Sequence, residues 1–580
     1  MATNVILPKQ GLQMTEGTLT QWLVKEGGDC KEGEPLFEME TDKLTITMDS
    51  PATGKLLKII HGAGDTVPIT KTIAIIGEAG EDISALLAEA APAAAPAAPA
   101  AQSDPSAPAA APAAAPTSNY EYDVAILGAG PGGYECAIRC AQLGLKAALI
   151  ENRELGGTCL NRGCIPTKAL LHAAEVYDEI KGASVFGISV GEPSVDFAKT
   201  AAFKNAKVAQ LRGGVEMLEK RNGVAVIRGT GKLTDVHTIA VDGKNVTAGK
   251  IVLATGSAPA QPPIPGIKDK NVITSDEVLS MTTLPDSFVI IGGGVIGIEF
   301  ATLFATLGKP VTVLEMLPTI MPGTDPEIVD IIKKVLAKRG VKIVNNAKVL
   351  GFHGGDTVTV DYEFEGKTVT AQGACCVVSI GRKPLTRDIG LEDVGVAVSK
   401  RGFVEINDKL ETSVPGIYAI GDITGKIQLA HVATAQGLVA AANCAGQSKT
   451  LKYDIVPACI YTNPEISFVG MSEEAAKKAG KAVKIGRFSV AGNGRCVAMN
   501  AGTGLVKIIA DERTGEIYGA QICAPRATDL IAEIAAVMKC EGTIEELADT
   551  IHPHPTVSEI VMQAAHDAEG LCCDAMPKRK

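Results

Sequence analysis

Residues 122–151 read YDVAILGAGPGGYECAIRCAQLGLKAALIE, a short apolar strand, a glycine turn, a helical stretch and a second strand. In such a unit Gly128 permits the tight turn, Gly130 lets the backbone approach a pyrophosphate, and Gly133 lets the helix pack on the strand. The helix N-terminus then faces the phosphates. Glu151 follows Gly128 by 151 − 128 = 23 residues, near the ~20 at which an acid holds a ribose hydroxyl. The stretch predicts a dinucleotide-binding domain.

The same pattern occurs a second time. The strand FVII, residues 288–291, leads into Gly292, Gly294 and Gly297, and the following strand ends at Glu315, so that 315 − 292 = 23 again. One such pattern is weak support, but two with identical spacing in the same strand–turn–helix–strand context are strong. The sequence therefore predicts two Rossmann-like domains.

Two cysteines stand between these units, in GGTCLNRGCIPTK at residues 156–168. A disulfide can be opened and reclosed only if its thiols lie close together and one is appreciably thiolate. We expect Cys159 and Cys164 at the start of a helix, whose N-terminus stabilises a thiolate, with Lys168 one turn later adding a cation. Two structural cysteines or half of a metal site are the alternatives. No second ligand pair has zinc-like spacing with this one, so we expect a redox pair and no metal.

Composition excludes several classes of protein. A chain of 580 residues with 46% hydrophobic residues is long enough for roughly four domains. A net charge of −11 and 4% aromatic residues are unfavourable for binding nucleic acid. The sequence contains no uninterrupted run of about 18 apolar residues, so it predicts no membrane span. The 14 cysteines are scattered along the chain, which is typical of reduced thiols in the cytoplasm.

Residues 79–118 are mostly Ala and Pro. Proline every few residues blocks a helix, and the segment has little to bury, so we expect a solvated, fairly extended linker. It separates the large body from residues 1–78, which read as short strands with Gly and Asp turns. Within them Val24–Glu40 matches Ile60–Ile76 in spacing. Two similar halves predict a flattened two-fold β-barrel, with Lys43 at a hairpin tip between them.

Residues 119–580 resemble the flavin disulfide reductases, most closely the dihydrolipoamide dehydrogenase family, through the two glycine units and the cysteine pair. Residues 1–78 resemble the lipoyl domains of 2-oxo acid dehydrogenase complexes. Related biotin carriers place Met on both sides of their lysine, whereas Lys43 lies between Asp42 and Leu44. The resemblance therefore implies lipoate attached to Lys43.

The resemblance also implies the cofactors, FAD at the first glycine unit and a nicotinamide nucleotide at the second. Glu315 is followed by MLPT, without an Arg to pair with a 2′-phosphate, which favours NAD over NADP. ATGSAP and YAIGDI match two further flavin-contacting segments of the family. By resemblance, five more residues lie at the cofactors: Lys168, Thr255, Gly256, Glu299 and Asp422.

In the resembled family, Cys164 faces the flavin and Cys159 exchanges with the substrate. The segment HPHPTVSE, residues 552–559, matches the family's base, with His554 taking a thiol proton and Glu559 fixing its tautomer. His552 is interpreted as a local structural residue. Because this segment reaches the partner subunit's flavin in the family, a homodimer is implied. The implied activity is oxidation of dihydrolipoyl groups with reduction of NAD, in a complex with a lipoyl-bearing acyltransferase and other subunits of a 2-oxo acid or acetoin dehydrogenase.

The expected fold is α/β, with two Rossmann-like domains and a C-terminal α+β dimerisation domain preceded by a small all-β domain. The expected boundaries are 1–78 for the lipoyl domain, 79–118 for the linker, 119–264 for the FAD domain, 265–388 for the NAD domain, 389–454 for a central domain and 455–580 for the interface domain. Two alternatives stay open, a metal- or small-disulfide reductase and a carrier whose lipoyl module tethers a complex. The terminal thiols Cys572 and Cys573 favour a metal- or small-disulfide reductase only weakly, because the chain also has the His554–Glu559 segment that matches the dihydrolipoamide dehydrogenase family.

Overall fold

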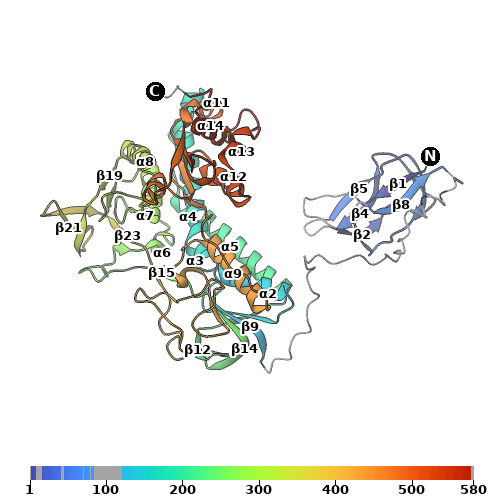
Figure 1. The fold of residues 1–580 in the computed structure, drawn as a ribbon, viewed down its shortest axis with the longest axis horizontal. Helices are drawn as coiled ribbons and strands as arrows, with labels where there is room; N and C mark the ends of the chain where they lie inside the picture. Colours follow the sequence, from blue (N-terminus) through green and yellow to red (C-terminus); the bar gives the residue numbers. More distant parts are fainter. Residues whose placement is uncertain are drawn as a thin grey trace. The chain divides into compact units, whose positions relative to one another are not determined.

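The structure is a computed structural model that describes residues 2–7, 16–40, 45–69, 71–78, 80, 81, 83, 86 and 120–575. These residues form two compact units, one on each side of residues 87–119 (Figure 1). Lys43 and most of the predicted linker lie outside the described residues. Among the residues that are described, no helix combines the length and the apolar character needed to cross a membrane.

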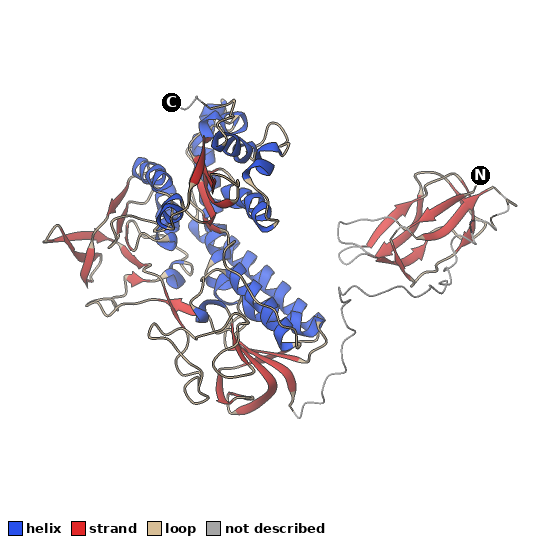
Figure 2. Ribbon diagram, in the orientation of Figure 1, coloured by secondary structure: helices blue, strands red, loops and turns tan. Residues whose placement is uncertain are grey.

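The N-terminal unit consists of two four-stranded sheets, with orders β1-β8-β6-β3 and β5-β4-β2-β7 (Figure 2). Adding four to each strand number of the first sheet, and returning to β1 after β8, gives the strand order of the second sheet. The two halves of the unit therefore have the same strand arrangement, and the predicted two-fold quasi-repeat is confirmed. Apolar side chains of both sheets, among them Leu19, Met39 and Leu56, are fully buried in one core between them. The strands are β1 (Thr3–Ile6), β2 (Glu16–Trp22), β3 (Asp29–Cys30), β4 (Pro35–Glu40), β5 (Thr45–Asp49), β6 (Gly54–Ile59), β7 (Thr66–Pro68) and β8 (Thr72–Gly77).

Two details bear on the predictions for this unit. Strands β4 and β5 are antiparallel and pair as far as Glu40 and Thr45, so the segment that contains Lys43 joins two paired strands. Glu81 falls within the predicted linker, yet its carboxylate accepts hydrogen bonds from the backbone of Ala2 at 2.7 Å and Glu78 at 3.0 Å. The contacts of the barrel therefore extend to Glu81.

The first glycine unit lies in a mostly parallel sheet of order β11-β10-β9-β14, to which β25 adds beside β14. An antiparallel extension, β13 and β12, continues from β14. Helices α2, α5 and α9 lie side by side on this sheet (Figure 1). The strands are β9 (Tyr122–Leu127), β10 (Ala147–Glu151), β11 (Ala225–Arg228), β12 (Gly231–Asp235), β13 (Thr238–Val241), β14 (Lys244–Leu253) and β25 (Ile417–Ala419). The helices are α2 (Pro131–Gln142), α3 (Gly157–Arg162), α4 (Cys164–Gly182), η1 (Ala183–Phe186), α5 (Phe197–Arg221), η2 (Gly421–Thr424) and α9 (Ala430–Cys444).

The second glycine unit lies in an all-parallel sheet of order β16-β23-β17-β18-β19. Cys375 and Cys376 are buried in β23, the strand interior that their apolar surroundings predicted. A ribbon of β15 (Ser257–Pro259) and β24 (Arg382–Pro384) joins the two Rossmann-like domains. The remaining elements are β16 (Val272–Ile273), α6 (Ser275–Val278), β17 (Phe288–Ile291), α7 (Val295–Thr306), β18 (Val311–Leu314), α8 (Pro326–Lys338), β19 (Val341–Val344), β20 (Lys348–His353), β21 (Val358–Phe364), β22 (Lys367–Gly373) and β23 (Cys375–Val378).

The C-terminal domain is an antiparallel sheet of order β26-β27-β30-β29-β28, covered by α12 and α14. Its core is formed by apolar side chains that alternate along β29 and β30 and meet those of the two helices. The elements are β26 (Ala458–Ile460), β27 (Glu465–Gly470), α10 (Glu473–Lys478), β28 (Val483–Ser489), η3 (Val490–Gly492), α11 (Gly494–Ala498), β29 (Leu505–Asp511), β30 (Ile517–Ala524), α12 (Ala527–Lys539), α13 (Ile544–Asp549) and α14 (Glu559–Ala568).

Candidate active site

One cavity of about 1370 Å³ brings together both glycine units and the cysteine pair. Fourteen of the residues predicted for the site line it: Gly128, Gly130, Gly133, Glu151, Cys159, Cys164, Lys168, Thr255, Gly256, Gly292, Gly294, Glu299, Glu315 and Asp422. Gly297 is buried beside this cavity in α7. The carboxyl ends of two separate parallel sheets thus face a common space, which is where α/β sheets bind their ligands.

The three glycines of the first unit have the three geometries that the turn requires. Gly128 has φ +107°, and a Cβ there would lie 2.4 Å from the carbonyl oxygen of Ala254. A Cβ on Gly133 would lie 1.9 Å from the carbonyl oxygen of Gly128, so helix and strand can approach only through glycine. A Cβ on Gly130 would meet nothing within 4 Å, which leaves open space where the turn meets the cavity.

The second unit repeats this geometry. Gly292 has φ +103° and would place a Cβ 2.6 Å from the carbonyl oxygen of Ser379, while a Cβ on Gly297 would lie 2.0 Å from that of Gly292. Gly294, like its counterpart, faces open space. The N-caps of α2 and α7 are Gly130 and Gly294, and neither helix has a side-chain cap among the described residues. Their first N–H groups are therefore available to a diphosphate, and both sites fit a dinucleotide.

The two acidic residues are held in the same way at both sites. Glu151 accepts hydrogen bonds from the backbone N–H of Ala129 at 2.8 Å and of Arg153 at 2.7 Å. Glu315 accepts from Gly293 at 2.5 Å and from Leu317 at 2.7 Å. These bonds fix each carboxylate beside its glycine turn, and each oxygen retains acceptor capacity for a ribose hydroxyl.

The two thiols differ in acidity because one hydrogen-bonds to the other. The thiol of Cys159 donates to Cys164, which raises the pKa of Cys159 further than its burial does. The same bond is the largest influence on Cys164. Although burial opposes ionisation, the bond and the nearby Lys168 ammonium lower the pKa of Cys164 to about 7. The thiolate therefore forms at Cys164.

The structure corrects one detail of the predicted thiol geometry. Cys164 is the first residue of α4, as expected, but Cys159 lies in the preceding short helix α3 and not at the start of α4. Gly163 separates the two helices, and a Cβ there would lie 2.9 Å from the carbonyl oxygen of Thr158. This sharp turn brings the two sulfurs together and leaves only Cys164 at the N-terminus of α4.

Lys168 is held between the two Rossmann-like domains. Its Nζ lies 2.9 and 3.0 Å from the two carboxylate oxygens of Glu299 in α7 and 4.4 Å from the ring centroid of Tyr461. The backbone N–H of Tyr461 donates to the same carboxylate at 3.0 Å. Tyr461 was missed by sequence reasoning, because a single aromatic residue near a short strand carries no signal for a site.

Arg382 is a second residue that the sequence did not reveal. Its Nε donates to the Ser257 hydroxyl at 2.8 Å and its Nη2 to the Ser257 carbonyl at 2.7 Å. The Ser257 hydroxyl donates in turn to Asp422. Arg382 therefore links the ribbon between the domains to the predicted flavin-contacting carboxylate.

The two histidines near the C-terminus have different surroundings. His554 is exposed, and its Nδ1 lies 2.8 Å from Glu559; within the described residues its Nε2 has no hydrogen-bond partner. Burial raises the pKa of Glu559, but hydrogen bonds from the Thr556 backbone and His554 outweigh it, so the pKa is lowered. His552 uses both ring nitrogens, on Thr550 and Glu533, as a local structural residue would.

Residues 122–437 match the family described as pyridine nucleotide-disulphide oxidoreductase, and residues 456–565 match the dimerisation domain of that family. The chain belongs to this family. The dimerisation domain supports a homodimer. Residues 3–76 match the family described as biotin-requiring enzyme, which includes lipoyl carriers.

Relatives of known name are similar over most of the oxidoreductase. Dihydrolipoyl dehydrogenase of Geobacillus stearothermophilus is 41% identical over 456 residues, which are 78% of this chain and 97% of that protein. Dihydrolipoyl dehydrogenase of Thermus scotoductus is 40% identical over 449 residues, 77% of this chain and 96% of that protein.

Solved structures of the family have the same fold. The Cu(II) complex of the HOCl-induced flavoprotein disulfide reductase RclA of Escherichia coli superposes with a TM-score of 0.70 at 31% identity and covers 77% of this chain and 98% of its own. LpdA of Mycobacterium tuberculosis superposes with a TM-score of 0.72 at 27% identity, over 77% and 99% of the two chains.

His554 does not line the cavity that contains the thiols in its own chain. In this chain, His554 and Glu559 lie within the matched dimerisation domain, residues 456–565. Cys572 packs against the core of that domain, and its thiol pKa is raised by burial, whereas Cys573 is exposed. The two terminal thiols are therefore in unlike environments and, unlike Cys159 and Cys164, do not lie in the cavity.

Proposed function

We propose that this protein is a dihydrolipoyl dehydrogenase, which oxidises protein-bound dihydrolipoyl groups and reduces NAD through the Cys159–Cys164 pair and FAD. One observation carries the proposal: a thiol pair, one member of which has a pKa of about 7, lines the same cavity as two dinucleotide-binding turns. The names of the relatives support this substrate over other disulfides.

The two cofactors have separate places in this cavity. Gly130, Glu151 and the N-terminus of α2 would hold FAD, together with Thr255, Gly256 and Asp422. Gly294, Glu315 and the N-terminus of α7 would hold NAD. Lys168 and Glu299 lie between the two turns and connect α4 to α7. Bound there, FAD would supply the two-electron chemistry that connects the reduced thiol pair to NAD.

The thiol chemistry follows from the unequal acidity of the cysteines. His554 of the second subunit accepts a proton at Nε2 from one substrate thiol. The resulting thiolate attacks Sγ of Cys159, the Cys159–Cys164 bond breaks, and Cys164 leaves as a thiolate. The second substrate thiol then attacks the substrate sulfur of this mixed disulfide and displaces Cys159, which takes the first proton from His554. His554 accepts the proton of the second thiol and releases it to solvent, and the lipoyl disulfide departs. The substrate loses two electrons and the cysteine pair gains them.

The N-terminal unit is proposed to carry lipoate on Lys43 and so to link the enzyme to an acyltransferase. The matched barrel and the pairing of β4 with β5 on either side of the segment support this. The complex is a 2-oxo acid or acetoin dehydrogenase. Intact mass of residues 1–80 from the native host should show a lipoyl addition, and unmodified lysine alone would contradict it.

The activity is tested by NAD reduction with dihydrolipoamide as donor. Wild-type protein should reduce NAD, and Cys159→Ser and Cys164→Ser should each abolish it, whereas Cys573→Ser should retain the full rate because its exposed thiol lies outside the cavity. A protein that reduced Cu(II) or small disulfides with NADH faster than it oxidised dihydrolipoamide would instead be a metal- or small-disulfide reductase.

A further inference from the structure

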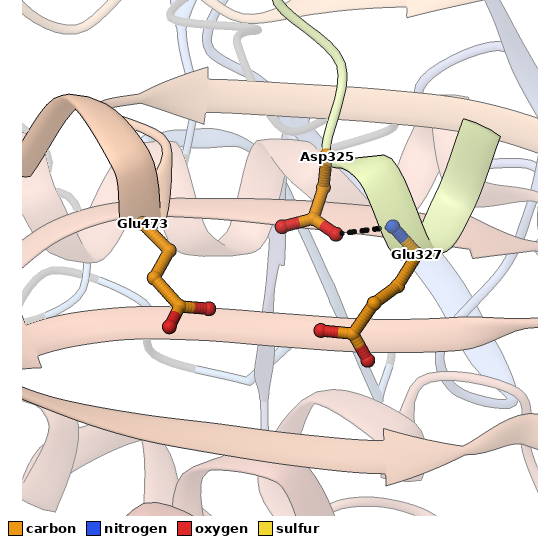
Figure 3. Close-up of side chains that lie close together, drawn as sticks. All are labelled: Asp325, Glu327 and Glu473. Carbon is orange, nitrogen blue, oxygen red and sulfur yellow. Dashed lines mark hydrogen bonds between the residues drawn. The ribbon is translucent and has the colours of Figure 1, made fainter. Parts of the chain in front are cut away.

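A buried lysine of the dimerisation domain contacts three carboxylates. Lys507 in β29 is 2% exposed, and its Nζ lies 2.7 Å from Asp325, 3.1 Å from Glu473 and also against Glu327. Figure 3 shows the three acids approaching one another from α8 and α10. An ammonium group already satisfies these acids, so the cluster is an ion network and not a metal site.

The network holds the start of α8, which belongs to the second Rossmann-like domain. Asp325 is 3% exposed and caps α8 by accepting the backbone N–H of Glu327 at 2.9 Å. Its own backbone N–H donates to the side chain of Gln521 in β30 at 2.7 Å. Gln521, itself 2% exposed, also donates to the carbonyl of Gly323 at 3.4 Å. Lys507 and Gln521, two buried polar residues of the dimerisation domain, therefore hold residues 323–325 in place by an ion pair and hydrogen bonds.

This segment in turn supports the second glycine turn. The backbone N–H of Met321 donates to the carbonyl of Gly293 at 2.8 Å, and the Ile320 side chain packs so closely that a Cβ on Gly293 would lie 2.6 Å from it. Met321 is buried and has φ +49°, a conformation that persists in a non-glycine residue only when its surroundings hold it. Gly293 itself donates to Glu315.

We propose that Lys507 and Gln521 are positioning residues for the NAD site, acting through residues 320–325 on the turn that binds the nucleotide. The inference rests on the proposed NAD site. Without Lys507 the Asp325 carboxylate would be buried with no opposite charge, which is strongly unfavourable, so the segment has to move toward water. Because Asp325 follows Met321 by only four positions, that movement reaches Gly293.

The test uses the full-length, FAD-loaded enzyme and compares Lys507→Met, Gln521→Leu and Lys507→Arg with wild type. Calorimetry should show NAD affinity weakened roughly 3- to 30-fold in the first two, the usual range for residues that act through a contact network. The KM for NAD should rise in parallel, while the KM for dihydrolipoamide and the FAD content stay unchanged. Lys507→Arg, which keeps the charge, should recover most of the affinity.

Lys484→Met is the matched control. Lys484 lies in β28 of the same sheet and pairs with Glu569 at the end of α14, away from residues 320–325, so its loss should leave NAD affinity unchanged. Folded Gln521→Leu with wild-type NAD affinity would overturn the inference, even if Lys507→Met failed to fold. Equal loss of FAD and NAD in Gln521→Leu would also overturn it, because the role would then be general stability. Wild-type protein that bound no NAD would overturn the proposed function itself, and this inference with it.

Discussion

Replacing Glu219 by Gln is expected to stabilise the protein more at neutral pH than at pH 5. Glu219 lies in α5, is 0% exposed, and neither of its carboxylate oxygens has a hydrogen-bond partner among the described residues. Burial raises its pKa from 4.5 to about 8. The folded protein therefore keeps this carboxyl protonated at neutral pH, whereas the unfolded chain releases the proton.

The magnitude follows from proton linkage. A carboxyl whose pKa is raised by folding costs stability as the pH rises from 4.5 to about 8, because the unfolded chain gains free energy by ionising. At ~1.4 kcal/mol per pH unit, the cost is about 1 kcal/mol at pH 5 and about 3 kcal/mol at pH 7. The glutamine side chain of the variant is neutral at every pH and carries no such cost.

The assay is denaturant unfolding of wild type and Glu219→Gln at pH 5 and pH 7, followed by fluorescence. The stability advantage of the variant should grow by about 2–3 kcal/mol between the two values. Glu216→Gln, which removes an exposed carboxylate three residues earlier on the same helix, is the control for the loss of a carboxylate from α5. A stability difference between Glu219→Gln and wild type that did not change with pH would refute the reasoning, since the carboxyl would then be ionised inside the fold.

Three further predictions concern the site. Alkylation of Cys164 in the reduced protein should reach half its maximal rate near pH 7, not near the ordinary thiol value of 9.0, and Cys159→Ser, which replaces the thiol donor by a hydroxyl, should change that midpoint. His554→Gln should lower dihydrolipoamide oxidation about 10²–10⁴-fold and spare NADH oxidation by an artificial dye; equal losses in both assays would point to a damaged dimer. Arg382→Met should weaken FAD retention roughly 10-fold or more, because charge-assisted hydrogen bonds to Ser257 are lost; FAD fluorescence released on dilution measures it, and unchanged retention would contradict the role.

Local backbone requirements explain why much of the fold could be predicted from the sequence. Gly128 and Gly292 need positive φ, and Gly133 and Gly297 leave no room for a Cβ, so the turn chemistry is written in residues a few positions apart. The two-fold barrel was likewise predicted from the matching residue spacing of Val24–Glu40 and Ile60–Ile76. The structure confirmed both glycine-turn domains, and the comparisons confirmed the family.

The sequence alone determined which residue types stand at which local turns, because turns, caps and strand patterns depend on neighbours along the chain. Only the tertiary structure decided which thiol is acidic, because the turn at Gly163 makes Cys159 a hydrogen-bond donor to Cys164, beside the Lys168 cation that the sequence already predicted. It also decided that Lys507 meets Asp325, 182 residues away, and that the Glu219 carboxylate has no hydrogen-bond partner within the described part of the chain. Charges and hydrogen bonds between distant segments depend on how whole domains pack, and packing leaves no short-range pattern from which such pairs can be predicted.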